Sequence, residues 1–344
     1  YAVTLVECTA GAAPGTPASA RFPSDGFAAL GARKTGPLRI HLIPINAGGR
    51  MPEITAAGIE IYRKRVMAMY PVTAVEFTMG EPLASSATSM CSHLNAIRTR
   101  RNADRAPIDL YYYGLTIGTS GGQAGCSTAT PTPNTAAKTS AGWWNPAGNQ
   151  GMLEGGAATL THEIGHGHGR LHSPCMVQDP DPNYPHRNAD IGVWAYDMRT
   201  DTFLPPTRKD MMSYCPNPDR SGAWLSDYTY QALLERVAGV NALVSPQALV
   251  IASSSPAVPW RQLTVDSVGV HWGEYPLMVQ DTPEGVAVTA LVRDSNGRAQ
   301  NIQVFREDLE DGVSGNAFTL TLPEPQPSWR TIEVPGLLEP QAFP

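Results

Sequence analysis

The spacing of apolar residues changes once along this 344-residue chain, near Val244. Before that point, runs of apolar residues such as "PLRIHLIPI", which starts at Pro37, alternate with stretches such as 52–70, where apolar residues recur at helical spacing. After Ser245 the apolar residues alternate in short segments, separated by the turn sequences "DSNG" and "EDGVSG". The pattern therefore predicts an α+β region followed by a region of strands alone.

Three parts follow from this pattern. Residues 1–36 begin with the alternating "YAVTLVEC" and continue as an Ala-, Gly- and Pro-rich linker, which predicts one short strand. Residues 37–244 predict a twisted mixed sheet with helices, then an irregular lower half and a closing helix that begins at Ser226 or Asp227. Residues 245–344 predict a small all-β sandwich of the immunoglobulin-like type.

Charge and hydropathy exclude two classes of partner. The formal net charge is −6 and the chain has no long basic run, so we expect no nucleic-acid partner. No segment reaches the roughly 18 consecutive apolar residues of a membrane-spanning helix, so we expect no membrane span. The densest basic cluster is interpreted as a solvated helix C-terminus rather than a phosphate site: Arg98, Arg100, Arg101 and Arg105.

The cysteines and the first residue indicate an extracellular protein. The chain has five cysteines and begins with Tyr rather than Met, which suggests a mature form whose signal segment has been removed. We therefore expect a secreted protein that acts as a monomer. Two disulfides are expected and, among the pairings that five cysteines allow, chain order favours Cys91–Cys126 and Cys175–Cys215, with Cys8 left over.

Four of the eight histidines lie within the segment "THEIGHGHGRLHSPC". His162 and His166 are four residues apart, so on a helix they share one face and can hold one metal ion, with Glu163 where a water would lie. Gly169 marks a place where the helix can end and the chain turn back, because glycine adopts positive φ at little cost. His172 then returns to the same ion. Three neutral imidazoles leave a fourth position open, which is typical of catalytic zinc sites.

The other histidines are assigned structural roles. His168 is two residues beyond His166, about 200° round the helix, and should point away from the ion. His41 and His186 have no partner at metal-ligand spacing. Cys175 as a fourth ligand would close the site, so a disulfide is the better interpretation of that residue.

The residues "HEIGHGHGRLH" resemble the long zinc motif of the metzincin metallopeptidases. That family also has a methionine-containing turn beneath the metal, and "KDMMSYC" is similar to it, with Met212 as the turn methionine. Tyr214 matches a tyrosine that approaches the zinc in astacin- and serralysin-like members; a packed core tyrosine is the alternative. The lower half resembles that of large secreted bacterial metzincins, relatives of which cleave mucin-type glycoproteins.

The resemblance implies a zinc-dependent endopeptidase that acts on extracellular proteins, with mucin-type glycoproteins as a candidate substrate class. The resemblance implies that Glu163 is the general base and that Tyr214 helps to stabilise the oxyanion of the tetrahedral intermediate. It also implies that substrate lies extended against an edge strand, for which we single out 121–127; an ordinary Gly-rich loop is the alternative. Structural calcium cannot be read from the sequence.

Several aromatic residues have both a structural and a binding interpretation. Trp143 and Trp144 are expected to be buried rather than to stack on a sugar or a side chain. Trp194, Tyr196 and Trp224 are expected in the core of the lower half. The aromatic residues of the predicted sandwich do not decide whether it binds carbohydrate: Trp260, Trp272, Tyr275 and Trp329.

A second function class is a binding or adhesion protein. Such a protein would keep the metzincin fold, be catalytically weak, and use the β-sandwich to attach to a surface or a carbohydrate. The presence of Glu163 beside three ligands argues against it, because a protein without activity gains nothing from a general base.

Overall fold

The computed structural model describes residues 2–4, 21–29, 31–117, 123–128, 138–144, 150–217, 222–244, 256–280, 282–310 and 316–344. The chain divides into two compact units, 1–34 and 35–344. In the described part of the first unit, β1 (Val3–Thr4) pairs antiparallel with β2 (Arg21–Phe22). The strand predicted in "YAVTLVEC" is therefore seen as two residues, and Cys8 lies outside the described part of the chain.

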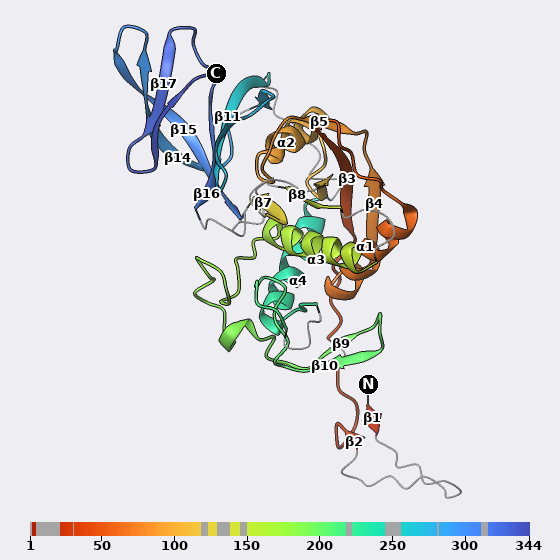
Figure 1. Ribbon diagram of the computed structural model, residues 1–344. Helices are drawn as coiled ribbons and strands as arrows, with labels where there is room; N and C mark the ends of the chain where they lie inside the picture. The colour runs from red at the N-terminus through yellow and green to blue at the C-terminus, as the bar shows by residue number, and fades with distance from the viewer. Residues whose placement is uncertain are drawn as a thin grey trace, which may run out of the picture. The chain divides into compact units, whose positions relative to one another are not determined.

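A mixed sheet forms the centre of the second unit (Figure 1). Four of its strands are parallel, in the order β4-β3-β6-β8, and a fifth, β7, runs antiparallel along β8. β5 pairs with the end of β3. The strands are β3 (Leu38–Ala47), β4 (Val75–Met79), β5 (Leu83–Ser85), β6 (Leu110–Thr116), β7 (Gly125–Thr128) and β8 (Thr139–Trp143). β3 and β6 are nearly all buried because helices cover both faces, which explains their continuous apolar sequences.

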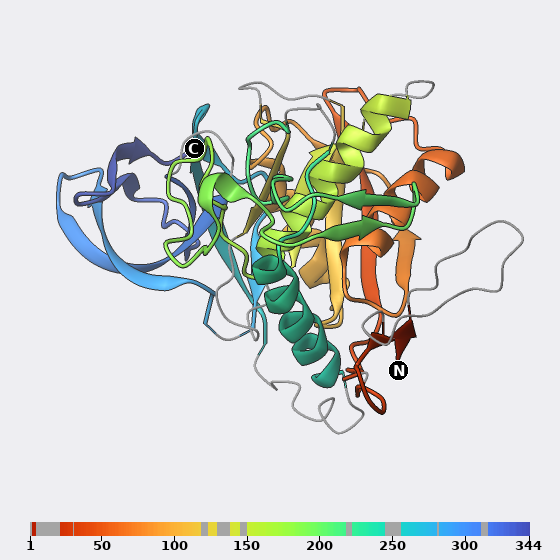
Figure 2. The ribbon, with the colours of Figure 1, turned by 90° about the horizontal axis from the view of Figure 1, so that it is seen from below.

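Helices cover this sheet in two layers. Side chains of α1 (Ala56–Met69), α3 (Gln150–Gly167) and α4 (Asp227–Ala242) share one apolar core with one face of β3 and β6. Figure 2 shows α3 and α4 in front of these strands. Side chains of α2 (His93–Ala103) pack against the opposite face. As predicted, α4 begins at Ser226, whose hydroxyl accepts a hydrogen bond from the Thr229 amide at 3.0 Å.

The lower half is irregular, as predicted, but two of its aromatic residues are not in a core. Trp194 and Tyr196 are 68% and 47% exposed, so their predicted burial is wrong. They lie at the hairpin of β9 (Ala195–Asp197) and β10 (Thr202–Leu204), a two-stranded sheet separate from the main one. Ala195 and Leu204 pack on the core from one face of the hairpin, and Trp194 and Tyr196, which flank Ala195 in the sequence, lie on the other face. Trp224 is buried, as expected.

The strands after residue 255 pair antiparallel and share one apolar core. Joined to the parallel strands of the central sheet, they form the large mixed sheet that the chain combines with helices, as predicted. They are β11 (Val258–Asp266), β12 (Gly269–Trp272), β13 (Leu277–Val279), β14 (Val286–Asp294), β15 (Ala299–Glu310), β16 (Ala317–Pro323), β17 (Trp329–Val334) and β18 (Leu338–Ala342). The immunoglobulin-like sandwich and its boundary near Val244 stay predictions.

The long strand β15 connects this C-terminal region to the central sheet. Its first part pairs with β14, and its end pairs with β7, where Leu309 lies opposite Thr128 and Glu310 opposite Ser127. A buried ion pair between Arg98 and Glu307 joins β15 to α2 as well. The interpretation of the arginine cluster as a solvated helix end is therefore wrong for Arg98. It is also wrong for Arg101, which is buried beneath the Pro107 and Leu110 carbonyls: Arg101 Nη2 donates to Pro107 at 3.1 Å.

None of the described helices is long and apolar enough to cross a membrane.

Candidate active site

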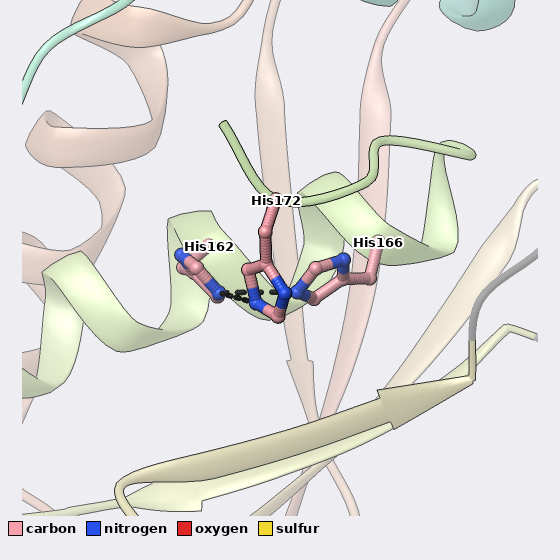
Figure 3. A group of neighbouring side chains, drawn as sticks. All are labelled: His162, His166 and His172. Atoms are coloured by element: carbon pink, nitrogen blue, oxygen red, sulfur yellow. Dashed lines mark hydrogen bonds between the residues drawn. The ribbon is translucent and has the colours of Figure 1, made fainter. Parts of the chain in front are cut away.

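Helix α3 and the segment after it bring three histidines together (Figure 3). The Nε2 atom of His162 lies 3.0 Å from that of His166 and 3.3 Å from that of His172. All three side chains are buried. The three ring nitrogens converge on one point, as the four-residue spacing on a helix and the return of the chain predict.

The return of His172 depends on how α3 ends. Gly169 has φ of +80°, and its amide donates to the His166 carbonyl at 2.7 Å. The Arg170 amide donates to the Gly165 carbonyl at 3.0 Å. This pair of bonds is a Schellman motif, which needs a left-handed residue that only glycine supplies without strain. The predicted reason for glycine at position 169 is therefore seen in the backbone.

Each ligand ring is also held through its other nitrogen. His162 Nδ1 contacts the Met211 carbonyl at 2.6 Å, and His166 Nδ1 contacts the Arg170 carbonyl at 2.6 Å. His172 Nδ1 lies 3.1 Å from Glu310 Oε2 at the end of β15. These acceptors keep the proton on Nδ1 and leave the Nε2 lone pair free for a metal. The sequence did not point to Glu310, because the contact depends on the pairing of β15 with β7.

The electrostatics of the cluster suit a metal cation. Burial, with a smaller contribution from His172, lowers the pKa of His162 to about 3. Burial and the neighbouring imidazoles also lower the pKa of His166 well below its usual value. Neutral imidazole is the form that ligates metals. Three nitrogen donors with room for a fourth ligand fit a catalytic zinc ion. Cys175 does not close the site, because it is bonded to Cys215.

Glu163 follows His162 on α3 and lies against strand β7. Its side chain is buried. A Cβ atom at Gly125 of β7 would collide with the Glu163 carboxylate, so the absence of a side chain at Gly125 leaves the space that this carboxylate occupies. A carboxylate beside the three histidines and next to an edge strand can exchange protons with a water held at the fourth metal position.

Tyr214 presents its hydroxyl to the metal side of the cluster. The Oη atom lies 2.6 Å from His172 Nε2. The tyrosine ring lies 4.9 Å from the His172 ring and 5.5 Å from the His162 ring, centroid to centroid, and the side chain is only partly buried. A hydroxyl at this place can donate a hydrogen bond to an oxygen bound near the metal.

The floor of the site is the turn that contains Met211 and Met212, both of them buried. A Cβ atom at Gly165 would lie 2.8 Å from Met212 Sδ, so the turn packs directly against α3. Asp210, which the sequence analysis missed, orders this turn: its carboxylate accepts from the Met212 amide at 2.8 Å and from the Ser226 amide at 2.9 Å. Asp210 is fully buried, and the sequence does not show this because its burial depends on the packing of the turn against the start of α4.

Both predicted disulfides are present. Cys175–Cys215 connects the segment after His172 to the end of the turn that contains Met211 and Met212. Cys91–Cys126 connects the chain before α2 to β7. The two bonds therefore fasten the third ligand and the edge strand, the two parts of the site that do not lie on α3.

The predicted substrate strand is only partly available. Residues 121 and 122 lie outside the described part of the chain, and β7 begins at Gly125. On the edge opposite β8, β15 already pairs with Ser127 and Thr128. Binding of an extended peptide along Gly125 and Cys126 stays a prediction, because residues 311–315, which follow β15, lie outside the described part of the chain.

The remaining histidines lie away from the cluster. His168 is buried on the far side of α3, where its Nε2 lies 3.2 Å from Tyr111 Oη and its Nδ1 contacts the Ile164 carbonyl at 2.7 Å. His41 and His186 make hydrogen bonds elsewhere, to Thr78 and Asp227 respectively. Of the two predicted buried tryptophans, Trp144 is buried, with its Nε1 donating to the Glu53 carbonyl at 2.7 Å, and Trp143 is partly buried.

Comparison with known proteins agrees with the chemistry of the site. Residues 81–222 match the family model described as Peptidase M66. No curated protein matches the chain. A solved structure titled "Structure of a chaperone-substrate complex" matches at 15% identity with a TM-score of 0.30, covering 63% of this chain and 35% of that one. This chain thus corresponds to about a third of that structure, and a likeness at this level carries no functional argument. The family match and the three-histidine cluster together support a metallopeptidase with a zinc site.

Proposed function

We propose that the protein is a secreted zinc-dependent endopeptidase of the metzincin type, which hydrolyses peptide bonds of extracellular proteins. The observation that carries the proposal is the convergence of three Nε2 atoms next to the buried carboxylate of Glu163 and strand β7. An open zinc site, a neighbouring base and a strand edge for an extended peptide are the parts that peptide hydrolysis requires. Two disulfides support an extracellular location.

The residues of this chain have separate tasks in the proposed reaction. When bound to the three histidines, zinc supplies Lewis acidity toward a water and the scissile carbonyl. Glu163 accepts a proton from the attacking water and passes it to the nitrogen of the departing amine. Tyr214 Oη donates a hydrogen bond to the oxyanion of the tetrahedral intermediate. The backbone of β7 at Gly125 and Cys126 orients the substrate by main-chain hydrogen bonds.

The test of the general base is Glu163→Gln. The variant should bind zinc as the parent does and hydrolyse an unfolded protein about 10²–10⁴-fold more slowly, because the amide cannot accept the proton. Glu154→Gln, a partly exposed position on the same helix, is the matched control and should keep the parental rate. Unchanged hydrolysis by Glu163→Gln would remove the residue from the mechanism. A parent protein that binds zinc and a surface or glycan but cleaves nothing would favour the adhesion alternative.

The test of the tyrosine is Tyr214→Phe. Loss of one hydrogen bond to the oxyanion should slow hydrolysis roughly 10–100-fold and leave zinc affinity almost unchanged. Tyr196→Phe removes an exposed hydroxyl on the β9–β10 hairpin and should leave the rate unaltered. A Tyr214→Phe enzyme with parental kcat would show that the hydroxyl only packs against His172.

Mucin-type glycoproteins are the substrate class proposed from the sequence resemblance. The direct test digests such a glycoprotein, its deglycosylated form and a plain unfolded protein side by side, and maps the cleavage sites by mass spectrometry. Cleavage that depends on the glycans supports this class. Equal cleavage of all three assigns the protein a general peptidase activity.

A further inference from the structure

We infer that Glu310 is a positioning residue for the third zinc ligand, and that the C-terminal strands are in this way part of the metal site. Glu310 Oε2 lies 3.1 Å from His172 Nδ1. His172 is buried and Glu310 is 20% exposed, so the contact is largely shielded from water. The inference rests on the proposed function only in taking the ion at the three histidines to be zinc.

The third ligand differs from the other two in how its ring is held. His162 and His166 lie on α3, and their Nδ1 atoms contact backbone carbonyls. His172 lies beyond the end of the helix, where the backbone alone leaves its ring free to rotate. A carboxylate on Nδ1 fixes the ring and its tautomer, and it strengthens Nε2 as a donor more than a neutral carbonyl does.

The fold places Glu310 at this position through strand pairing. Gly125 and Ser127 of β7 are two residues apart and so lie on the same face of the sheet, the face that contacts Glu163 on α3. Glu310 is directly opposite Ser127 and shares that face. Its neighbour Leu309 points the other way, into the buried core formed with α2.

Further contacts hold the end of β15 in place. Leu309 is buried, and Glu307 forms the buried ion pair with Arg98 of α2. Cys126, next to Ser127 on β7, is bonded to Cys91. The carboxylate of Glu310 is therefore presented by a fixed backbone rather than by a free loop. Residues 81–222, which match the peptidase family, do not contain Glu310.

The experiment measures zinc affinity of the full chain by competition with a chromophoric chelator, without peptide substrate. Glu310→Ala should weaken zinc binding roughly 10–100-fold, the usual loss in affinity when a residue that hydrogen-bonds to a metal-ligating histidine is removed. Glu310→Gln keeps an oxygen acceptor without the charge and should fall between the parent and Glu310→Ala. Asp308→Ala removes an exposed carboxylate from the same face of the same strand and should bind zinc like the parent.

A spectroscopic reading separates ligand positioning from general destabilisation. With Co²⁺ in place of zinc, the visible absorption of Glu310→Ala should shift, because the geometry of His172 changes, whereas Asp308→Ala should give the parental spectrum. The unfolding temperature of the metal-free proteins should be the same for parent and Glu310→Ala. If Glu310→Ala does not fold, Glu310→Gln decides: weaker zinc binding supports the inference, and parental affinity overturns it.

Parental zinc affinity in a folded Glu310→Ala variant overturns the inference, and so does an equal loss in Asp308→Ala. Neither result depends on peptide cleavage. A protein whose zinc affinity depends on Glu310 but which cleaves no peptide contradicts the proposed function and leaves this inference standing.

Discussion

Buried histidines lie on both sides of α3, but those on one side form the metal cluster and the one on the other side does not. On one face, the Nε2 atoms of His162 and His166 lie 3.0 Å apart. On the other face, His168 stacks on the Tyr111 ring at 4.7 Å between centroids. All three rings are buried, and each contacts a backbone carbonyl through Nδ1. Burial and the Nδ1 contact therefore do not identify a metal ligand. A metal ligand is identified instead by the convergence of its Nε2 lone pair with those of other imidazole rings.

The charged side chains near the two sides of α3 also differ in sign. Next to His168, the Lys138 ammonium lies 2.7 Å from Tyr111 Oη, in the interior of the protein. Burial, together with this cation, lowers the pKa of His168 well below its usual value. The metal face has carboxylates instead, those of Glu163 and Glu310. A cation is thus disfavoured on one face of the helix and favoured on the other.

Replacing one histidine on each side of α3 by alanine gives the largest expected effect. His166→Ala should weaken zinc binding by roughly a thousandfold or more, since complete zinc sites are worth on the order of 10–16 kcal/mol. His168→Ala should keep parental zinc affinity but lower the free energy of unfolding by about 3 kcal/mol, because it leaves a buried cavity beside Tyr111. Chelator competition and urea unfolding measure the two quantities. Loss of zinc in His168→Ala would break the comparison.

A smaller effect on stability is expected when the turn beneath the three histidines is altered. Asp210→Asn replaces one carboxylate oxygen with an NH₂ group that cannot accept from the Met212 or Ser226 amide, which should cost about 2–3 kcal/mol in urea unfolding. Asp201→Asn is the control: the residue is exposed, and asparagine tolerates its positive φ of 55°. A stability change below about 0.5 kcal/mol in Asp210→Asn would show that the carboxylate does not order the turn.

A further test concerns how stability depends on pH. Burial and the Arg236 cation lower the pKa of Lys138 from 10.5 to about 7. Between these two values the unfolded chain binds more protons at this residue than the folded chain does, so the Lys138 contribution makes stability rise with pH across that window. Lys138→Met lacks this contribution and should gain most over the parent near neutral pH, with the gain shrinking as the pH approaches about 10.

Urea unfolding at several pH values between about 6 and 10 measures this slope. Lys64→Met, at an exposed position of α1, should differ from the parent by the same amount throughout. A constant difference for Lys138→Met would mean that the lysine is solvated in the folded protein.

The parts of the fold that follow from local spacing could be predicted from the sequence. The helix with His162 and His166, the glycine turn and the buried strand after Pro37 are all encoded within a few neighbouring residues. Chain order pointed to the correct disulfides, and the Met turn implied by the family resemblance stays a prediction.

What the sequence did not predict depends on contacts between distant segments. The role of Glu310 requires the pairing of β15 with β7, and nothing in the alternation of either strand specifies its partner. Arg98 belongs to a basic cluster whose burial becomes visible only when Glu307 lies beside it. Trp194 and Tyr196 were predicted to lie in a core, but they lie on the outward face of the β9–β10 hairpin, whose other face packs on the core through Ala195 and Leu204.

The close approach of Gly125 to Glu163 also provides a way to sort related sequences. A relative that keeps the histidines and the glutamate, but has any side chain at the position of Gly125, cannot hold its carboxylate where this protein does. Such a sequence would match the zinc motif and still hold its carboxylate elsewhere. One backbone position on β7, far from the motif in sequence, thus distinguishes relatives that can place the proposed base as this protein places Glu163 from those that cannot.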